Sequence, residues 1–279
     1  MPKVIKQLNR LSIFASHHIA PRASFLPFAL RPSTFGLLLT FNLSFVIINC
    51  GLDIENPTPP SAPVWVQKSL PEEWPERGID AHESGGIILE WEPNQQDGNI
   101  STYYIYRAMV ENISDSSASF ILRSKLKVEP NASSKFLDGE VGIGIFYHYK
   151  LKAEDEAHNM SDYSEIKSYS LLPMINSQLM IPNGLSDTAW TNSALSWHYP
   201  YVVEMEDYSI TILDAQDELI IRTTFSPENY VSEREYWQFP SDLSLDSGHV
   251  YRWRIDTNAS YSGARESSGS ESNWATFRF

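Results

Sequence analysis

The sequence repeats itself once over about 105 residues, and this repeat limits the folds open to the chain. A short apolar run that ends in Trp91 recurs 106 positions later as a run that ends in Trp197. Farther on, Tyr147 begins an alternating segment, and Tyr251 begins a matching segment 104 positions later. A unit of this length is a whole domain rather than one turn of a solenoid. The repeat therefore predicts two similar domains in tandem.

Within each unit, apolar and polar residues alternate with the period of a β-strand. Residues 147–153 read YHYKLKA, and residues 251–256 read YRWRID. Both segments predict strands with one face buried and the other in water. The fourteen tyrosines and eight tryptophans agree with this prediction, because aromatic side chains favour a pleated, half-buried surface. We therefore expect an all-β protein with two tandem antiparallel β-sandwiches.

Both units resemble fibronectin type III domains, which are two-sheet sandwiches of the immunoglobulin-like class. Trp91 and Trp197 match the second-strand tryptophan, which fills the core between the sheets in that family. Tyr147 and Tyr251 match the tyrosine-corner position, whose hydroxyl bonds nearby backbone. The resemblance implies the family's seven-stranded fold for each unit.

The resemblance extends over residues 60–279 and is closer in the first unit. Residues 153–161 read AEDEAHNMS, which is similar to the family's A-x-D-x-x-G-N-x-S loop, with His158 where Gly is usual. We therefore expect one domain at residues 60–173 and a second at residues 174–279. The Arg-Gly-Asp tripeptide of integrin-binding members is absent from the sequence, so cell attachment by that route is not implied.

Residues 1–49 are predicted to be a signal and targeting segment. Phe35–Ile48 is an uncharged, mostly apolar run of fourteen residues, which is shorter than a membrane-spanning helix. It leads into Cys50 through a junction that resembles a bacterial lipobox, with Asn49 where Gly, Ala or Ser is usual. The resemblance implies lipidation of Cys50, and the alternative is an incidental cysteine after an ordinary signal. Residues 50–59 then form a proline-containing linker.

The charge distribution argues against one class of partner. The whole chain has a formal net charge of −14, but residues 1–49 hold five basic residues and no acidic ones. The remaining 16 basic and 35 acidic residues give −19. Because such a surface repels phosphate backbones, nucleic acid is not an expected partner.

The sequence offers no recognisable catalytic, cofactor-binding or metal-binding motif. It lacks the G-x-S-x-G, H-E-x-x-H and Gly-rich phosphate-loop patterns, and its single cysteine can form no disulfide within the chain. His148 is expected to point outward on its strand, as a histidine with satisfied hydrogen bonds. Acidic runs at residues 154–156 and 214–218 are interpreted as solvated loop charge, with weak calcium binding as the alternative. We therefore predict no enzyme activity and no cofactor.

These features predict a non-catalytic protein that is secreted across the cytoplasmic membrane and lipid-anchored in the bacterial cell envelope. Its modules are expected to bind an unknown envelope or extracellular protein or glycan, or to act as a spacer. The alternative is a carbohydrate-binding accessory module of a polysaccharide-handling system, in which exposed aromatic rings stack on sugars. Several aromatic residues either form such platforms or plug the sandwich ends: Trp65, Trp74, Tyr163, Trp190, Tyr199, Tyr201 and Trp237.

Overall fold

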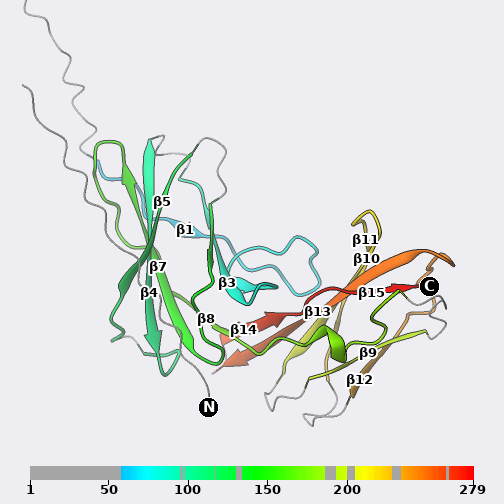
Figure 1. Cartoon of the computed structure of the whole chain (residues 1–279). Coiled ribbons are helices and arrows are strands. Elements are labelled where there is room, and N and C mark those ends of the chain that lie inside the picture. Colours follow the sequence, from blue (N-terminus) through cyan, green and yellow to red (C-terminus); the bar gives the residue numbers. More distant parts are fainter. Residues whose placement is uncertain are drawn as a thin grey trace, which may run out of the picture. The chain divides into compact units, whose positions relative to one another are not determined.

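The computed structural model describes residues 58–279, apart from 95–96, 98, 116, 130–133, 186–192, 200–204, 228–233 and 262–263. Within these residues the chain is built of strands, with one short 3-10 helix, η1, at Ser177–Leu179 (Figure 1). The predicted all-β class is confirmed. The predicted signal segment, most of the linker and Cys50 lie outside the described residues. In the described part of the chain, no helix has the length and apolar character needed to cross a membrane.

The first sandwich consists of two antiparallel sheets. One sheet pairs β3 (Gly86–Glu92) with β1 (Val64–Trp65), β2 (Asp80–His82) and β6 (Lys135–Asp138). The other sheet has the strand order β8-β7-β4-β5. Its members are β4 (Ile100–Val110), β5 (Ile121–Lys127), β7 (Phe146–Asp155) and β8 (Lys167–Leu171).

The second sandwich repeats this arrangement. Its smaller sheet pairs β9 (Ala194–His198) with β12 (Arg234–Gln238). In its larger sheet, β10 lies between β11 and β13, and both β14 and β15 pair with β13. These strands are β10 (Asp207–Asp214), β11 (Leu219–Phe225), β13 (Val250–Tyr261), β14 (Ala264–Glu271) and β15 (Ala275–Arg278). The strand order makes each unit a fibronectin type III-like sandwich, as predicted.

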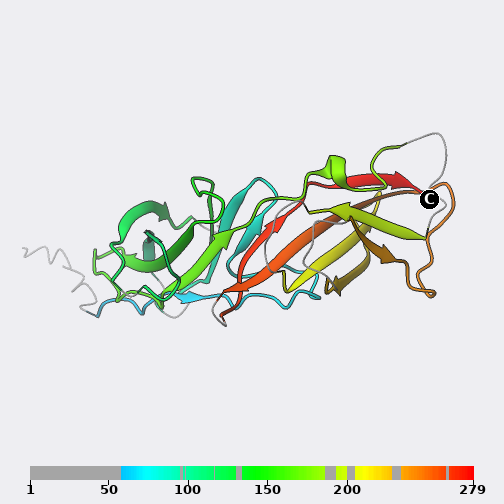
Figure 2. The ribbon, with the colours of Figure 1, turned by 90° about the horizontal axis from the view of Figure 1, so that it is seen from below.

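The larger sheets of the two sandwiches are continuous. β14 pairs in parallel with β8 where Gly269 lies opposite Leu171, so one sheet runs from β11 to β5 (Figure 1, Figure 2). A Cβ atom at Gly269 would lie 2.6 Å from both the Thr257 carbonyl oxygen and the Tyr169 hydroxyl oxygen. Glycine is therefore required at this position, because any side chain would displace backbone at the junction of the two sheets.

Each sandwich has its own apolar core. Trp91 is 1% exposed in the first core and Trp197 is fully buried in the second, which confirms their predicted role. Leu171 belongs to the first core, and the next residue, Leu172, belongs to the second. The domain boundary that we place between residues 173 and 174 lies beside this change of core and stays a prediction.

The tyrosine corners predicted for both units are present. The Tyr147 hydroxyl accepts a hydrogen bond from the Gly142 N–H at 2.8 Å, and the Tyr251 hydroxyl accepts one from the Asp246 N–H at 2.8 Å. The loop after β7 also follows the family pattern. His158, which stands in place of the usual glycine, has a φ of 65°, in the left-handed region that glycine favours.

Candidate functional site

A loop of the first sandwich packs against the second sandwich. This loop, residues 67–78, connects β1 to β2. Its Pro71 carbonyl accepts hydrogen bonds from Arg222 Nε at 2.9 Å and from the Ser209 hydroxyl at 3.2 Å. Ser209 lies on β10, on the face turned away from the core, because its neighbours on both sides in the strand belong to the core. The 67–78 loop therefore covers the outer face of β10 and β11.

Backbone geometry fixes the base of the 67–78 loop. Gly78 has a φ of 86°, and a Cβ atom there would lie 2.8 Å from backbone atoms of Lys68. The Gly78 N–H also donates a hydrogen bond to the Glu90 carboxylate at 2.9 Å. A larger residue at position 78 would be strained and would separate the two ends of the loop. The local fold thereby determines where Glu76 is presented.

Two arginines of the second sandwich bind Glu76. Arg254 Nη2 lies 2.6 Å from each Glu76 carboxylate oxygen, and Arg222 Nη2 lies 2.7 Å from one of them. The same arginines contact Asp256, at 3.0 Å from Arg254 Nε and 3.3 Å from Arg222 Nη2. Glu271, at the end of β14, lies 3.3 Å from Arg254. We term these five residues the ionic joint.

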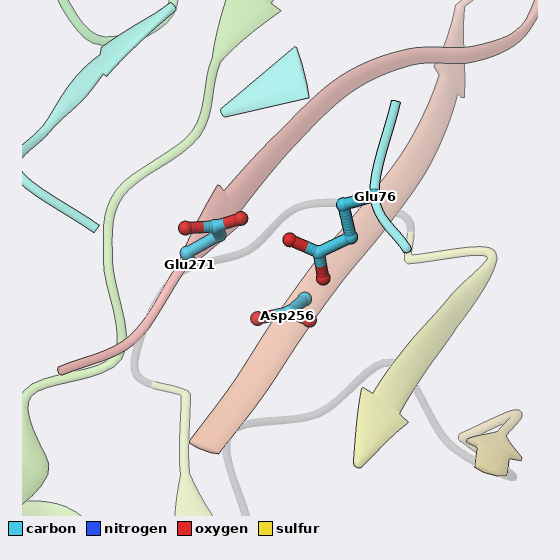
Figure 3. Close-up of side chains that lie close together, drawn as sticks. All are labelled: Glu76, Asp256 and Glu271. Carbon is cyan, nitrogen blue, oxygen red and sulfur yellow. The ribbon is translucent and has the colours of Figure 1, made fainter. Parts of the chain in front are cut away.

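The three carboxyl groups of the ionic joint converge from separate segments. Figure 3 shows Glu76 on the 67–78 loop, Asp256 on β13 and Glu271 at the end of β14. One carboxylate oxygen from each lies within 4.8 Å of the others. Carboxylates at this spacing can bind a divalent cation, but here two guanidinium groups already supply the positive charge. We therefore interpret the cluster as a structural contact rather than a metal site.

The three carboxyl groups of the ionic joint differ in pKa. Burial opposes ionisation of Glu76, but the charges of Arg254 and Arg222 outweigh it and lower the Glu76 pKa to about 2. Burial and the nearby Asp256 charge raise the pKa of Glu271 to about 10, against the attraction of Arg254. Burial also raises the pKa of Asp256. Glu271 therefore keeps its proton at neutral pH, which reduces repulsion among the three carboxyl groups.

The ionic joint overturns one expectation from the sequence. The alternation in residues 251–256 predicts a wet polar face, and this is wrong for Arg254 and Asp256, which are each 7% exposed. The physical reason is that the 67–78 loop covers this face. Charged residues that alternate along a strand usually mark solvent, so the sequence carried no signal for the burial. Nothing in the spacing linked Glu76 to Arg254, which lies 178 positions away.

The seven aromatic residues that the sequence analysis left between binding platforms and sandwich interior divide between core and surface. Trp65, Tyr199 and Trp237 are buried, and Trp74 and Tyr163 are exposed. Trp190 and Tyr201 lie outside the described residues. The buried three confirm the interpretation that such residues fill the sandwich. Tyr163 is 44% exposed and belongs to a surface described below.

His148 has both ring nitrogens in hydrogen bonds, as predicted, but it is not solvent-exposed. Its Nε2 lies 3.0 Å from the Asp115 carbonyl oxygen, and its Nδ1 lies 2.7 Å from the Ser168 hydroxyl. The side chain does alternate with the buried Tyr149, yet it is only 4% exposed, because the loop at Asp115 covers it. Its outward direction therefore does not bring it into contact with water.

The acidic loops are more structured than solvated charge would be. Asp155 is 2% exposed, and its carboxylate accepts a hydrogen bond from the Asn159 N–H at 2.7 Å. Glu154 accepts a hydrogen bond from the Tyr104 hydroxyl at 2.6 Å. In the second loop, the Asp214 carboxylate accepts bonds from two backbone N–H groups farther along the turn. The interpretation as solvated charge is therefore wrong for Asp155, whereas Glu156, Asp217 and Glu218 are exposed as predicted.

Comparison with known proteins gives likeness of structure only. No family model matches the chain, and no curated protein matches it either. Among solved structures, the FN1–FN3 domains of chicken CNTN1 match with 15% identity and a TM-score of 0.30, over 78% of this chain and 65% of that one. The chain thus spans less than two thirds of that structure. The alpha chain of the chicken interferon gamma receptor matches with 12% identity and a TM-score of 0.31, over 78% of this chain and 98% of that one.

Proposed function

We propose that this protein is a non-catalytic binding or spacer protein of the bacterial cell envelope, lipid-anchored through Cys50. The observation that carries the proposal is the continuous sheet from β11 to β5, which joins two fibronectin type III-like sandwiches into one body. Domains of this fold serve as scaffolds that present surfaces, and their function depends on those surfaces rather than on the fold. The apolar run before Cys50 supports an exported, anchored location.

The ion pairs of Glu76 and Asp256 argue against a catalytic role for these two carboxylates. A general acid or base must reach a substrate atom within hydrogen-bond distance, directly or through one water molecule. In the ionic joint, Glu76 and Asp256 are instead held by Arg222 and Arg254, which are 5% and 9% exposed at their side chains. The perturbed pKa values of this cluster are therefore explained by its structural role.

Anchoring is tested by expressing the full chain in the organism that encodes it and separating membranes by detergent phase partitioning. The wild-type chain is expected in the detergent phase with an acylated N-terminal cysteine in its mass spectrum. The Cys50→Ser variant is expected in the aqueous phase. Equal partitioning of both chains would contradict lipid anchoring.

Binding is tested separately by cross-linking the full chain on intact cells and recovering it under denaturing conditions. A binding protein is expected to carry an envelope protein or glycan with it. Recovery of the chain alone would leave only the spacer role. The outcome does not depend on the anchoring experiment, because the Cys50→Ser variant can be added from outside to the same cells.

A further inference from the structure

Four lysines, of which Lys125 and Lys127 are exposed and Lys150 and Lys152 are half-buried, lie on the outer face of the larger sheet of the first sandwich. Lys150 and Lys152 extend from β7, and Lys125 and Lys127 extend from β5, on the other side of β4 (Figure 1). Side chains two positions apart on a strand lie on the same face, about 7 Å apart, and neighbouring strands are about 5 Å apart. The four side chains therefore share one face of the sheet, which we term the lysine face.

Aromatic rings hold two of these ammonium groups in place. Lys150 Nζ lies 4.1 Å from the ring centre of Phe120 and 3.8 Å from that of Tyr163. Lys152 Nζ lies 4.4 Å from the same Tyr163 ring. Cation–π contacts of this kind restrict flexible lysines, so less conformational entropy is lost when a ligand binds.

Rings and charges also alternate across the strands. The register places Tyr104 of β4 opposite Lys125 on one side and opposite Lys152 on the other. Lys125 Nζ lies 4.9 Å from the centre of the Tyr104 ring. The Tyr104 hydroxyl donates to Glu154, which fixes the ring at the end of the lysine face. The face thus offers half-buried rings between positive charges.

The lysine face is not explained by needs of the fold alone. Among the ion pairs formed by the described residues, none involves its four lysines. Lysines on an edge strand such as β5 prevent unwanted strand pairing. That reason does not apply to Lys150 and Lys152, because β7 lies inside the sheet between β8 and β4.

The positive residues of the lysine face are lysines rather than arginines, which indicates the chemical class of the partner. Protein interfaces are enriched in arginine, whose planar fork binds carboxylates in pairs, and are depleted in lysine. Lysine acts as a point charge that suits separate anionic groups along a polymer. Tyr163, which is 44% exposed, can contact an apolar sugar face. The rest of the chain is negatively charged and repels polyanions. This repulsion is stronger for a densely charged polymer such as nucleic acid than for a glycan with at most one charge per sugar.

We propose that the lysine face binds an anionic polysaccharide, that is, a glycan bearing carboxylate or sulfate groups. The proposal rests on the binding role proposed above and specifies its ligand class. The acidic remainder of the protein makes the interaction local and sensitive to ionic strength.

The test measures binding of the full chain to immobilised polygalacturonate, with a neutral dextran and poly-glutamate as comparison polymers. The double variant Lys150→Gln, Lys152→Gln is compared with the control Lys135→Gln, Lys167→Gln, which has the same net charge. Lys135 and Lys167 already pair with Glu90 and Glu165, away from the lysine face. Thermal unfolding of each variant shows that it is folded.

The proposal predicts that polygalacturonate binds, that dextran does not, and that the Lys150/Lys152 variant binds about tenfold more weakly, which corresponds to 1.4 kcal/mol. Tyr163→Leu is expected to weaken binding to polygalacturonate with no change in charge. Equal binding of poly-glutamate would indicate an acidic polypeptide partner and overturn the proposal, as would equal losses in the control variant or no binding at all. In those cases capture of envelope material by cross-linking would still stand as evidence for the binding role.

Discussion

The matching strands β7 and β13 place different residues at equivalent positions and so give the same face of the sandwich different uses. Three positions after the corner tyrosine, β7 has Lys150 and β13 has Arg254. Two positions farther on, β7 has Lys152 and β13 has Asp256. In the first sandwich the loop at Asp115 covers His148 on this face and leaves Lys150 and Lys152 half-buried. In the second sandwich the 67–78 loop covers Arg254 and Asp256.

The difference shows how a side chain fits its surroundings. Arg254 sits under the loop and contacts three carboxyl groups, which its branched guanidinium can do at once. Lys150 remains at the surface, where its single ammonium group rests on two rings. The same strand position therefore forms ion pairs in the joint of one sandwich and contacts aromatic rings in the other.

The largest effect on the free energy of unfolding is expected from the substitution Arg254→Met. The substitution leaves Glu76, Asp256 and Glu271 close together with one arginine, so we expect a loss of about 3–5 kcal/mol in the free energy of unfolding. Lys150→Met, at the equivalent position, should cost about 1 kcal/mol, because it removes only the ring contacts of a half-buried lysine. Urea unfolding of both variants measures the two costs. Similar costs would contradict the distinction between the two faces.

A smaller effect on stability is expected from a change of pH, and it should arise from the ionic joint of the second sandwich. The folded-state pKa of Glu271 is raised to about 10, above its ordinary value of 4.5, so the folded chain holds a proton that the unfolded chain releases. Stability from this group is therefore full below about pH 4.5 and falls as the pH rises toward about 10. Glu271→Gln keeps a neutral side chain, so its unfolding free energy should fall less steeply between about pH 7 and about pH 10.

Glu76 gives the opposite sign and serves as the control. Its pKa is lowered to about 2, so its contribution is present above its ordinary value of 4.5 and is lost as the pH falls toward about 2. Glu76→Gln should therefore flatten the acid side of the stability profile. It should reduce the alkaline slope less than Glu271→Gln does, because Glu76 is a smaller cause of the raised Glu271 pKa than burial is. A Glu271→Gln profile that parallels the wild type on the alkaline side would refute the assignment of the proton.

The smallest effect should be the same in both sandwiches. Tyr147→Phe and Tyr251→Phe each remove one hydroxyl that accepts a backbone hydrogen bond at 2.8 Å. Each should cost about 1 kcal/mol in the free energy of unfolding. Thermal or urea unfolding checks the pair, and a clear inequality between them would show that the two sandwiches are not equivalent at their corners.

The sequence predicted what depends on local pattern. The core tryptophans, the tyrosine corners and the strand alternation all follow from residues close to one another in the chain, and the structure confirms them. The left-handed His158 was visible as a departure from a glycine position. Each of these features needs only the neighbouring residues to specify it.

The ionic joint and the lysine face could not be predicted in the same way. Glu76 reaches Arg254 across 178 positions, through a loop whose path depends on the packing of two sandwiches. Lys150 and Lys152 were readable as the polar face of a strand, but Phe120 and Tyr163 approach them from loops. Alternation shows which side chains share a face and does not show what lies over that face.

Lysine footprinting of the full chain tests most directly whether the lysine face of the first sandwich binds the polymer. The chain is acylated with an amine-reactive ester with and without polygalacturonate, and modification is read by mass spectrometry. We expect Lys125, Lys150 and Lys152 to react in the free chain and to be protected by the polymer, while Lys135 and Lys167 react equally in both. Protection spread evenly over all five lysines, or absent from the lysine face, would contradict the account.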